Sequence, residues 1–284
     1  MRFQTRIIRH QSEGSQWELA VRRPALPLQA YIHDICGYSE KSPAPLSRRE
    51  FPAPQVVVII EFGTPLRVFA PGSTQSHARY TGGFVAGLDD RFTLTEHDGA
   101  QQGIQLNLTP IGARLFFGIP MSELRSQVVS LDDLLPPAQK HLAEKLASLP
   151  HWDARFDLIE RLIMGRIGSP SLQLDVVAWA VRRIEASAGT IDMRTLAAQM
   201  GYSQKHAIKL FHEHVGVPPK LLARIVRFDR LVQHLKTGGA ESWSELALKF
   251  HYYDQAHMIR EVRRFTGLSP GDASRTLIDF PVLG

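Results

Sequence analysis

The C-terminal part of the chain contains an internal repeat, which constrains the fold more than any other feature of the sequence. Leu196, Ala197 and Met200 align with Leu246, Ala247 and Phe250 at an offset of fifty residues. After a turn the offset becomes fifty-one, and the aligned pairs are Ser203 with Asp254, His206 with His257, Lys209 with Arg260, Phe211 with Val262, Gly216 with Gly267, and Pro219 with Pro270. Each copy has the pattern of a short helix, a tight turn, a longer helix and a Gly-x-x-Pro stop. This pattern predicts two helix-turn-helix units.

Apolar residues recur at helical spacing through residues 171–284. The spacing predicts helices over 171–189, 192–201, 203–216, 218–239, 242–251, 254–267 and 269–277. The fourth segment carries an apolar stripe on an i, i+3, i+4 pattern, formed by Leu221, Leu222, Ile225, Phe228, Leu231, Val232 and Leu235. Such a stripe is typical of an amphipathic helix, and we expect this one to be a rod that joins the two units.

The N-terminal part is strand-rich to about residue 135. Residues 55–69 consist of two apolar runs around a Gly-Thr-Pro turn and predict a hairpin, and residues 82–88 and 103–110 predict further strands. Helical patterns follow at 110–124, 136–149 and 155–167, and Gly168, Ser169 and Pro170 then break the pattern. We therefore expect an α+β chain with a strand-rich domain at 1–170 and an all-α domain at 171–284, each with a core of its own.

Charge and cysteine content narrow the function classes. Lys and Arg number 11 against 6 Asp and Glu in residues 201–264, so the basic excess lies in the repeat, where an anionic partner would bind. The single Cys36 excludes an internal disulfide and every Cys-rich zinc motif. The start of the chain has no signal-peptide pattern and no stretch is long and apolar enough to span a membrane, so we expect a cytoplasmic protein without membrane contact.

The second helix of each unit has residue types suited to reading DNA. Ser203 and Asp254 are typical N-caps. In the second unit Met258, Val262 and Phe265 share one face and should be buried, so the opposite face is outward. That face carries Gln255, Ala256, Arg260 and Arg263. Arg pairs with guanine and Gln with adenine in the major groove, although a solvated polar face is the alternative for any single residue.

These motifs resemble the DNA-binding domain of the AraC/XylS transcription regulators. The resemblance rests on "LAAQMGYSQKHAIKLFHEHVGVPPK", "LARIVRFDRL" and "HYYDQAHMIREVRRFTGLSP". It implies two helix-turn-helix motifs in successive major grooves of double-stranded DNA. By position, Lys205, Ile208 and Lys209 would read bases in the first unit and Gln255, Ala256, His257 and Arg260 in the second; Ser203, Asp254, Arg263 and Arg264 complete the expected interface. Ile208 and Ala256 stand where the family often has polar residues, and His251 stands where it usually has Gly in the turn.

The resemblance also suggests roles for the N-terminal domain. Residues within 84–135 resemble one regulator subgroup, which implies a small-molecule effector or a homodimer, with RNA polymerase as a further partner and activation of transcription as one outcome. We expect a pocket between the strands and the helix at 113–119, with contents that the sequence does not specify. We expect no cofactor and no metal, because no HxH with a later Glu and His occurs in strand context and His212 and His214 point apart on a helix.

Two alternatives remain beside a transcription regulator. A DNA-repair enzyme could use the same double module, but its chemistry needs a reactive Cys and Cys36 stands alone. A sequence-tolerant architectural DNA binder is disfavoured by a net charge of only +5. No Ser-His-Asp set, P-loop or dinucleotide fingerprint is recognisable, so we expect no catalytic residues and no enzyme.

Overall fold

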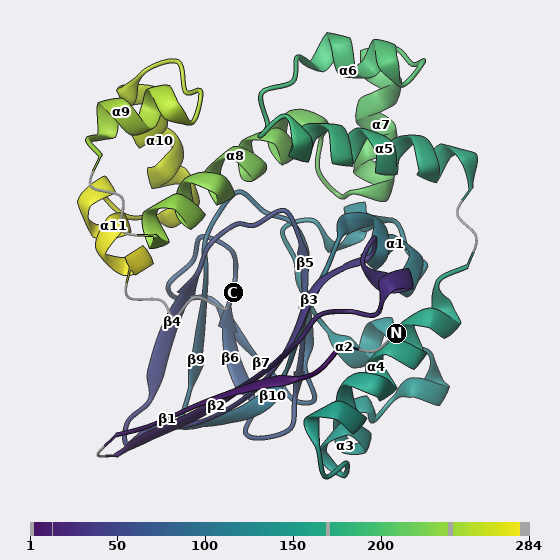
Figure 1. The fold of residues 1–284 in the computed structure, drawn as a ribbon, viewed down its shortest axis with the longest axis vertical. Helices are drawn as coiled ribbons and strands as arrows, with labels where there is room; N and C mark the ends of the chain where they lie inside the picture. The colour runs from purple at the N-terminus through teal and green to yellow at the C-terminus, as the bar shows by residue number, and fades with distance from the viewer. Residues whose placement is uncertain (1–2, 13, 169–170, 238–240, 279–284) are drawn as a thin grey trace.

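The computed structural model describes residues 3–12, 14–168, 171–237 and 241–278. Strands occupy the N-terminal part and helices the remainder, as the sequence predicts (Figure 1). Ser169 and Pro170, on which the predicted boundary falls, and Gly238 and Gly239 of the predicted rod lie outside the described residues.

The larger of two antiparallel sheets has seven strands. Their order is β1 (Arg6–Ser12), β2 (Ser15–Arg22), β3 (Ile32–Lys41), β10 (Ala100–Leu108), β5 (Val56–Glu61), β8 (Phe84–Ala86) and β11 (Val128–Ser130). Ile104 of β10 lies opposite Gly37 of β3 and Ile60 of β5, so the register aligns apolar residues across the middle of the sheet. The predicted strands at 82–88 and 103–110 are confirmed as β8 and the end of β10.

The smaller sheet has the order β4 (Leu46–Glu50), β9 (Thr93–His97), β6 (Leu66–Phe69) and β7 (His77–Tyr80). It packs against the larger sheet through a cluster that includes Ile59, Leu66, Val68 and Phe84. The predicted hairpin over 55–69 is wrong, because β5 and β6 belong to different sheets. The carboxylate of Glu61 accepts hydrogen bonds from the backbone N–H groups of Gly63 and Gln102, which hold the connecting loop to β10 rather than closing a hairpin.

Helices cover the other face of the larger sheet. They are α1 (Pro110–Phe117), α2 (Leu131–Leu134), α3 (Leu142–Ala147) and α4 (Trp152–Arg166), with 3₁₀ turns η1 (Leu26–Leu28), η2 (Met121–Leu124) and η3 (Pro137–Gln139). Arg22 at the end of β2 fixes α4 to the sheet, because its buried guanidinium pairs with Asp157 at 2.9 Å and Glu160 at 3.1 Å. Unpaired, this buried charge would carry a large desolvation cost.

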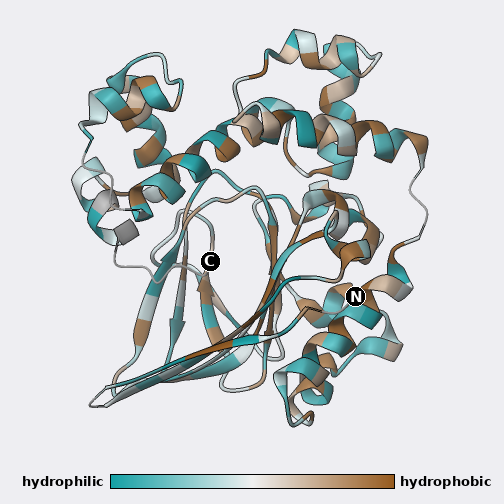
Figure 2. Cartoon of the chain, in the orientation of Figure 1, coloured by the Kyte–Doolittle hydropathy of each residue, from teal (hydrophilic) through white to brown (hydrophobic). Residues whose placement is uncertain are grey.

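The C-terminal helices follow the predicted pattern closely. They are α5 (Leu172–Ala186), α6 (Met193–Gln199), α7 (Gln204–His214), α8 (Pro219–Lys236), α9 (Trp243–Lys249), α10 (Gln255–Thr266) and α11 (Pro270–Ile278). Figure 1 shows α8 running between the unit of α6 and α7 and the unit of α9 and α10. Its ribbon alternates between hydrophobic and hydrophilic colours in Figure 2. Six of the seven residues of its predicted stripe are buried and Leu221 is half-buried, which confirms the amphipathic rod.

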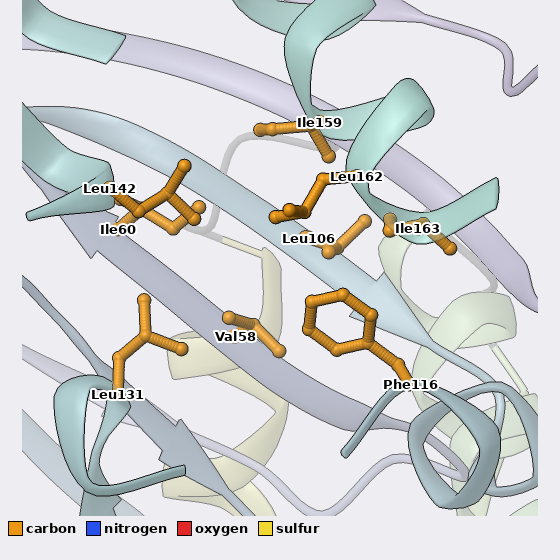
Figure 3. Close-up of a pocket in the computed structure, with 9 residues that line it drawn as sticks. All are labelled: Val58, Ile60, Leu106, Phe116, Leu131, Leu142, Ile159, Leu162 and Ile163. Atoms are coloured by element: carbon orange, nitrogen blue, oxygen red, sulfur yellow. The ribbon is translucent and has the colours of Figure 1, made fainter. Parts of the chain in front are cut away.

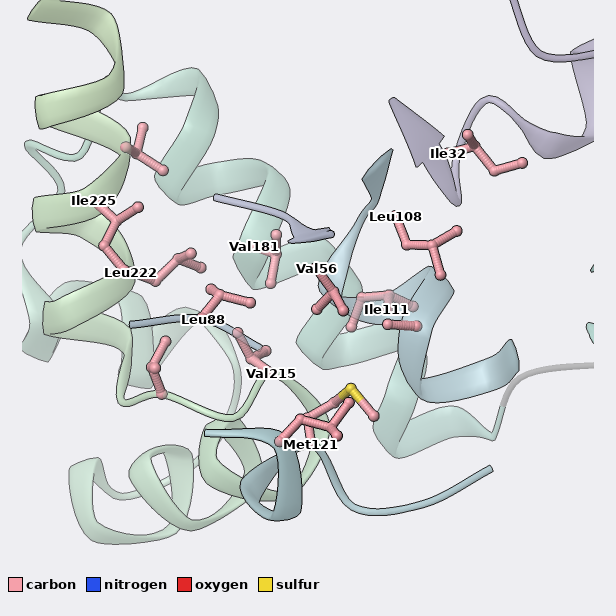
Figure 4. Close-up of a cluster of buried hydrophobic side chains, with 14 of the residues drawn as sticks. Ile32, Val56, Leu88, Leu108, Ile111, Met121, Val181, Val215, Leu222 and Ile225 are labelled. Carbon is pink, nitrogen blue, oxygen red and sulfur yellow. The ribbon is translucent and has the colours of Figure 1, made fainter. Parts of the chain in front are cut away.

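Buried apolar side chains from both parts of the chain belong to one contiguous cluster, which includes Ala20 and Ala273. Figure 4 shows part of this cluster. The boundary expected near residue 170 stays a prediction. The parts meet where the turn after α7 packs on η2. A Cβ added to Gly216 would lie 2.7 Å from the carbonyl oxygen of Met121, so the two backbones approach more closely than a side chain would permit. Val215 and Val217, on either side of this glycine, are buried.

Candidate nucleic-acid interface

The two repeat copies have the same backbone construction. Both short helices begin at an N-cap, Asp192 for α6 and Ser242 for α9, and Ser242 forms a capping box with Glu245. In the turns, the N–H of Tyr202 donates to the carbonyl of Ala197 at 3.1 Å, and the N–H of Tyr252 donates to that of Ala247 at 2.9 Å. The predicted helix-turn-helix repeat is therefore present.

The longer helices begin and end as the sequence predicts. The hydroxyl of Ser203 accepts a hydrogen bond from the N–H of His206 at 3.3 Å, and the carboxylate of Asp254 accepts one from the N–H of His257 at 2.6 Å. These caps satisfy backbone donors at the N-termini of α7 and α10. Both helices are followed by a glycine with positive φ, 89° at Gly216 and 68° at Gly267.

On α7 the three predicted reading residues share the exposed face. Lys205 and Lys209 are exposed, and Ile208 is 43% exposed although it is a large apolar residue. The opposite face is buried and consists of Ala207, Leu210 and Phe211. An apolar side chain between two lysines can contact a thymine methyl group in the major groove.

On α10 the predicted division into faces is also observed. Met258, Val262 and Phe265 are buried, and the exposed residues include Gln255, Ala256, Arg260 and Arg263. Within the described part of the chain, Arg260 and Arg263 have no acidic partner. The side-chain oxygen of Gln255 accepts a hydrogen bond from the hydroxyl of Ser244 on α9 at 2.8 Å, which orients its amide at the start of the helix.

His257 and Arg264 are less open to solution than Arg260. The His257 ring lies edge-on to Tyr252, with centroids 5.6 Å apart, and its Nε2 is 4.0 Å from a carboxylate oxygen of Glu261. The Nε of Arg264 pairs with Oδ2 of Asp90, in the loop between β8 and β9, at 2.5 Å. This ion pair raises the pKa of Arg264 above its usual value.

A buried carboxylate that sequence reasoning missed connects α10 to the rod. Glu261 is 4% exposed, and its two oxygens accept hydrogen bonds from Arg224 at 2.7 Å and Arg227 at 3.3 Å. In the first repeat copy the aligned residue is Leu210, so the second unit has an ion pair where the first has an apolar contact. In the sequence, the one indication of this ion pair is that Glu261 falls on the same helix face as the apolar residues Met258 and Val262. Arg224, His257, Arg260, Glu261, Arg263 and Arg264 together line an open groove beside α10.

In the N-terminal part, a small cavity lies between β5, β10 and the surrounding helices (Figure 3). Its volume is about 10 Å³, close to the minimum for one water molecule. Every lining side chain is apolar: Val58, Ile60, Leu106, Phe116, Leu131, Leu142, Ile159, Leu162 and Ile163. The cavity occupies the place predicted for a pocket, but it has no polar group to orient a ligand and is too small for an organic effector.

The described residues contain no group of three His, Cys, Asp or Glu residues that is placed to hold a metal ion. Cys36 is buried, and burial raises the pKa of its thiol to about 12, so the reactive thiolate is disfavoured. None of the described helices is long and apolar enough to cross a membrane.

The two parts of the chain match two different protein families. Residues 196–276, which contain both repeat copies and α8, match a family described as "Helix-turn-helix domain". The chain carries an AraC-type helix-turn-helix domain. Domains of this type occur in DNA-binding transcription regulators. Residues 20–130 match a family described only as "Domain of unknown function (DUF6597)".

Solved structures with a similar arrangement include ToxT from Vibrio cholerae O395. That comparison has 9% identity and a TM-score of 0.48, and covers 83% of this chain and 98% of the other. Unsaturated fatty acid bound wild-type ToxT from V. cholerae strain SCE256 has 10% identity and a TM-score of 0.49, with 85% and 99% covered. No curated protein matches the sequence.

Proposed function

We propose that one copy of this chain reads two successive major grooves of a specific DNA site, with α7 in one groove and α10 in the next. The observation that carries this proposal is the equivalence of the two exposed helix faces. Each lies on a capped helix, follows the same turn and presents cations at aligned positions, Lys209 and Arg260. If these faces were only in contact with solvent, nothing would require the two copies to carry cations at aligned positions.

The length of α8 supports the same arrangement. Its 18 residues correspond to about 27 Å at 1.5 Å per residue. Successive major grooves on one side of B-DNA are about 34 Å apart. The rod therefore has the scale needed for two units of one chain to meet neighbouring grooves, and its attachment to α10 through Glu261 restricts their relative orientation.

The reading residues divide by chemistry. The guanidinium of Arg260 can pair with guanine, and the side-chain amide of Gln255 can pair with adenine. Lys205 and Lys209 can donate to guanine or to phosphate. Ile208 and Ala256 can contact only apolar groups such as the thymine methyl. We assign Arg263 to the same face, and Ser203 and Asp254 to capping, through which they fix the helix N-termini at the groove.

We assign a regulatory role to residues 1–170, as a domain that binds an effector or forms a homodimer, with RNA polymerase as a further partner of the bound regulator. The contact between η2 and α7 supports coupling, because a change in the N-terminal part would reach the first unit directly. The small apolar cavity does not supply an effector site by itself.

Selection from a random-sequence duplex library with the full-length chain tests the proposal. We expect enrichment of two short conserved segments about 10 base pairs apart. The enriched duplex should bind about 10³-fold or more tightly than a scrambled duplex of equal length at physiological salt. Equal binding to both would instead indicate an architectural DNA-binding protein.

A further inference from the structure

We propose that Arg264 and Arg224 can hold a backbone phosphate of DNA, and that in the unaltered chain the carboxylate of Asp90 occupies this site and so withholds it from the phosphate. The inference rests on the proposed DNA-binding function and adds to it a contact residue, Arg224, and a competing residue in the N-terminal part. Asp90 would thus reduce the affinity of the second helix-turn-helix unit for DNA.

Asp90 lies between two arginines from different helices. Its Oδ2 is 2.5 Å from Nε of Arg264 on α10 and 3.9 Å from Nη1 of Arg224 on α8. The Asp90 side chain is 13% exposed, whereas that of Arg264 is 58% exposed. The carboxylate is therefore covered by the contact, while the guanidinium of Arg264 still has surface on which another anion could bind.

The surroundings favour an anion. The groove beside α10 is lined by four arginines and one carboxylate, and that carboxylate, Glu261, is already bound by Arg224 and Arg227. The local charge is thus positive without Asp90. A carboxylate and a phosphodiester each present anionic oxygens to a guanidinium, so they compete for the same donors.

The position of Arg264 points to the backbone rather than to the bases. Arg260 and Arg263 lie on the outward face of α10. Arg264 lies on the side of α10 that is next to the rod α8. When a helix enters the major groove, its flanks are the parts nearest the phosphates. A residue there contributes affinity without sequence preference.

Two further contacts join the N-terminal part to the end of α10, one from β4 and one from the loop that carries Asp90. Arg49 of β4 donates to the carbonyl of Thr266 at 3.1 Å, and its guanidinium stacks 3.9 Å from the ring centre of Phe92. Phe92 packs so closely on Gly267 that an added Cβ would lie 2.4 Å from the ring. The carboxylate of Asp90 is therefore held in position, which favours its pairing with Arg264 over an open state.

The salt dependence of DNA binding tests the exchange, because each phosphate contact adds about 0.9 to the slope of log K against log salt concentration. The probe is a fluorescent mixed-sequence 30-base-pair duplex, since phosphate contacts need no operator. Asp90→Asn should steepen the slope by about one contact, so that affinity falls about 3 to 4-fold more than in the unaltered chain over a fourfold rise in salt. Asp133→Asn, an exposed residue of α2, makes the same charge change away from α10 and should leave the slope unaltered.

Arg264→Gln completes the test. In the unaltered chain it should hardly change the slope, because Arg264 is occupied by Asp90, whereas in the Asp90→Asn background it should return the slope to the original value. Two results would overturn this inference and leave the proposed function standing. One is a slope that Asp90→Asn does not change, and the other is an Arg264→Gln substitution that reduces the slope equally with and without Asp90. Failure of every variant, the unaltered chain included, to bind duplex DNA would overturn the proposed function and this inference with it.

Discussion

Gly201 and His251 occupy the same position in the two turns and share a left-handed backbone, with φ of 76° and 56°. Glycine adopts this region without cost, whereas a residue with a Cβ is strained by about 1–2 kcal/mol. The His251 side chain is exposed, and it is the backbone carbonyl that accepts a hydrogen bond from Arg227. The second turn is therefore built with strain that the first turn avoids.

His251→Gly should raise the free energy of unfolding by about 1 kcal/mol, because it removes the strain and keeps the carbonyl in place. Urea denaturation followed by circular dichroism measures the change. Gly201→Ala is the matched control in the first turn, where an added Cβ meets no atom within 4 Å, so any loss comes from the backbone alone. A destabilised His251→Gly variant would show that the imidazole makes a favourable contribution.

Glu261→Gln should lower the free energy of unfolding by about 3 kcal/mol, because it leaves Arg224 and Arg227 without their buried anion. Thermal and urea unfolding measure the change. The control is Glu213→Gln, because Glu213 is a half-exposed carboxylate on α7, and for this variant we expect a change below about 0.5 kcal/mol. Equal effects of the two substitutions would mean that Glu261 does not hold α10 to α8.

Acid sensitivity should depend on Glu18. The indole N–H of Trp152 donates to its carboxylate at 2.7 Å and, as the main cause, lowers the pKa of Glu18 below 4.5. A carboxylate with a lowered folded-state pKa stabilises the fold above pH 4.5, and this contribution is lost as the pH falls through the folded-state pKa. Glu18→Gln and Trp152→Phe should both flatten the decline of stability below pH 4.5. A decline as steep as in the unaltered chain would exclude this pair as its source.

Residues 171–284 expressed alone should keep the seven helices and bind DNA, since both units and α8 lie within them. The fragment should be less stable than the same helices in the full chain, because its buried apolar residues lose their contacts with the apolar residues of the N-terminal part. Circular dichroism and a duplex-binding titration check both points. An unfolded fragment would place the domain boundary before residue 171.

The helices of the repeat could be predicted from sequence because their signals are local. Caps at Ser203 and Asp254, the glycine at 267 and the spacing of Met258, Val262 and Phe265 act within a few residues. The pairing of β5 with β10 could not be predicted, because Glu61 binds the backbone of Gln102, far along the chain. The Asp90–Arg264 ion pair joins residues 174 positions apart, and no pattern in either segment indicates it.

Methylation interference on a selected duplex tests the central claim, that one chain reads two grooves through α7 and α10, most directly. With one copy of the full-length chain bound, we expect two major-groove patches about 10 base pairs apart. Lys209→Ala should erase one patch and Arg260→Ala the other, each at a cost of about 1–3 kcal/mol in binding. A single patch, or two patches that both persist in the Arg260→Ala variant, would contradict the claim and leave α10 as a solvated helix.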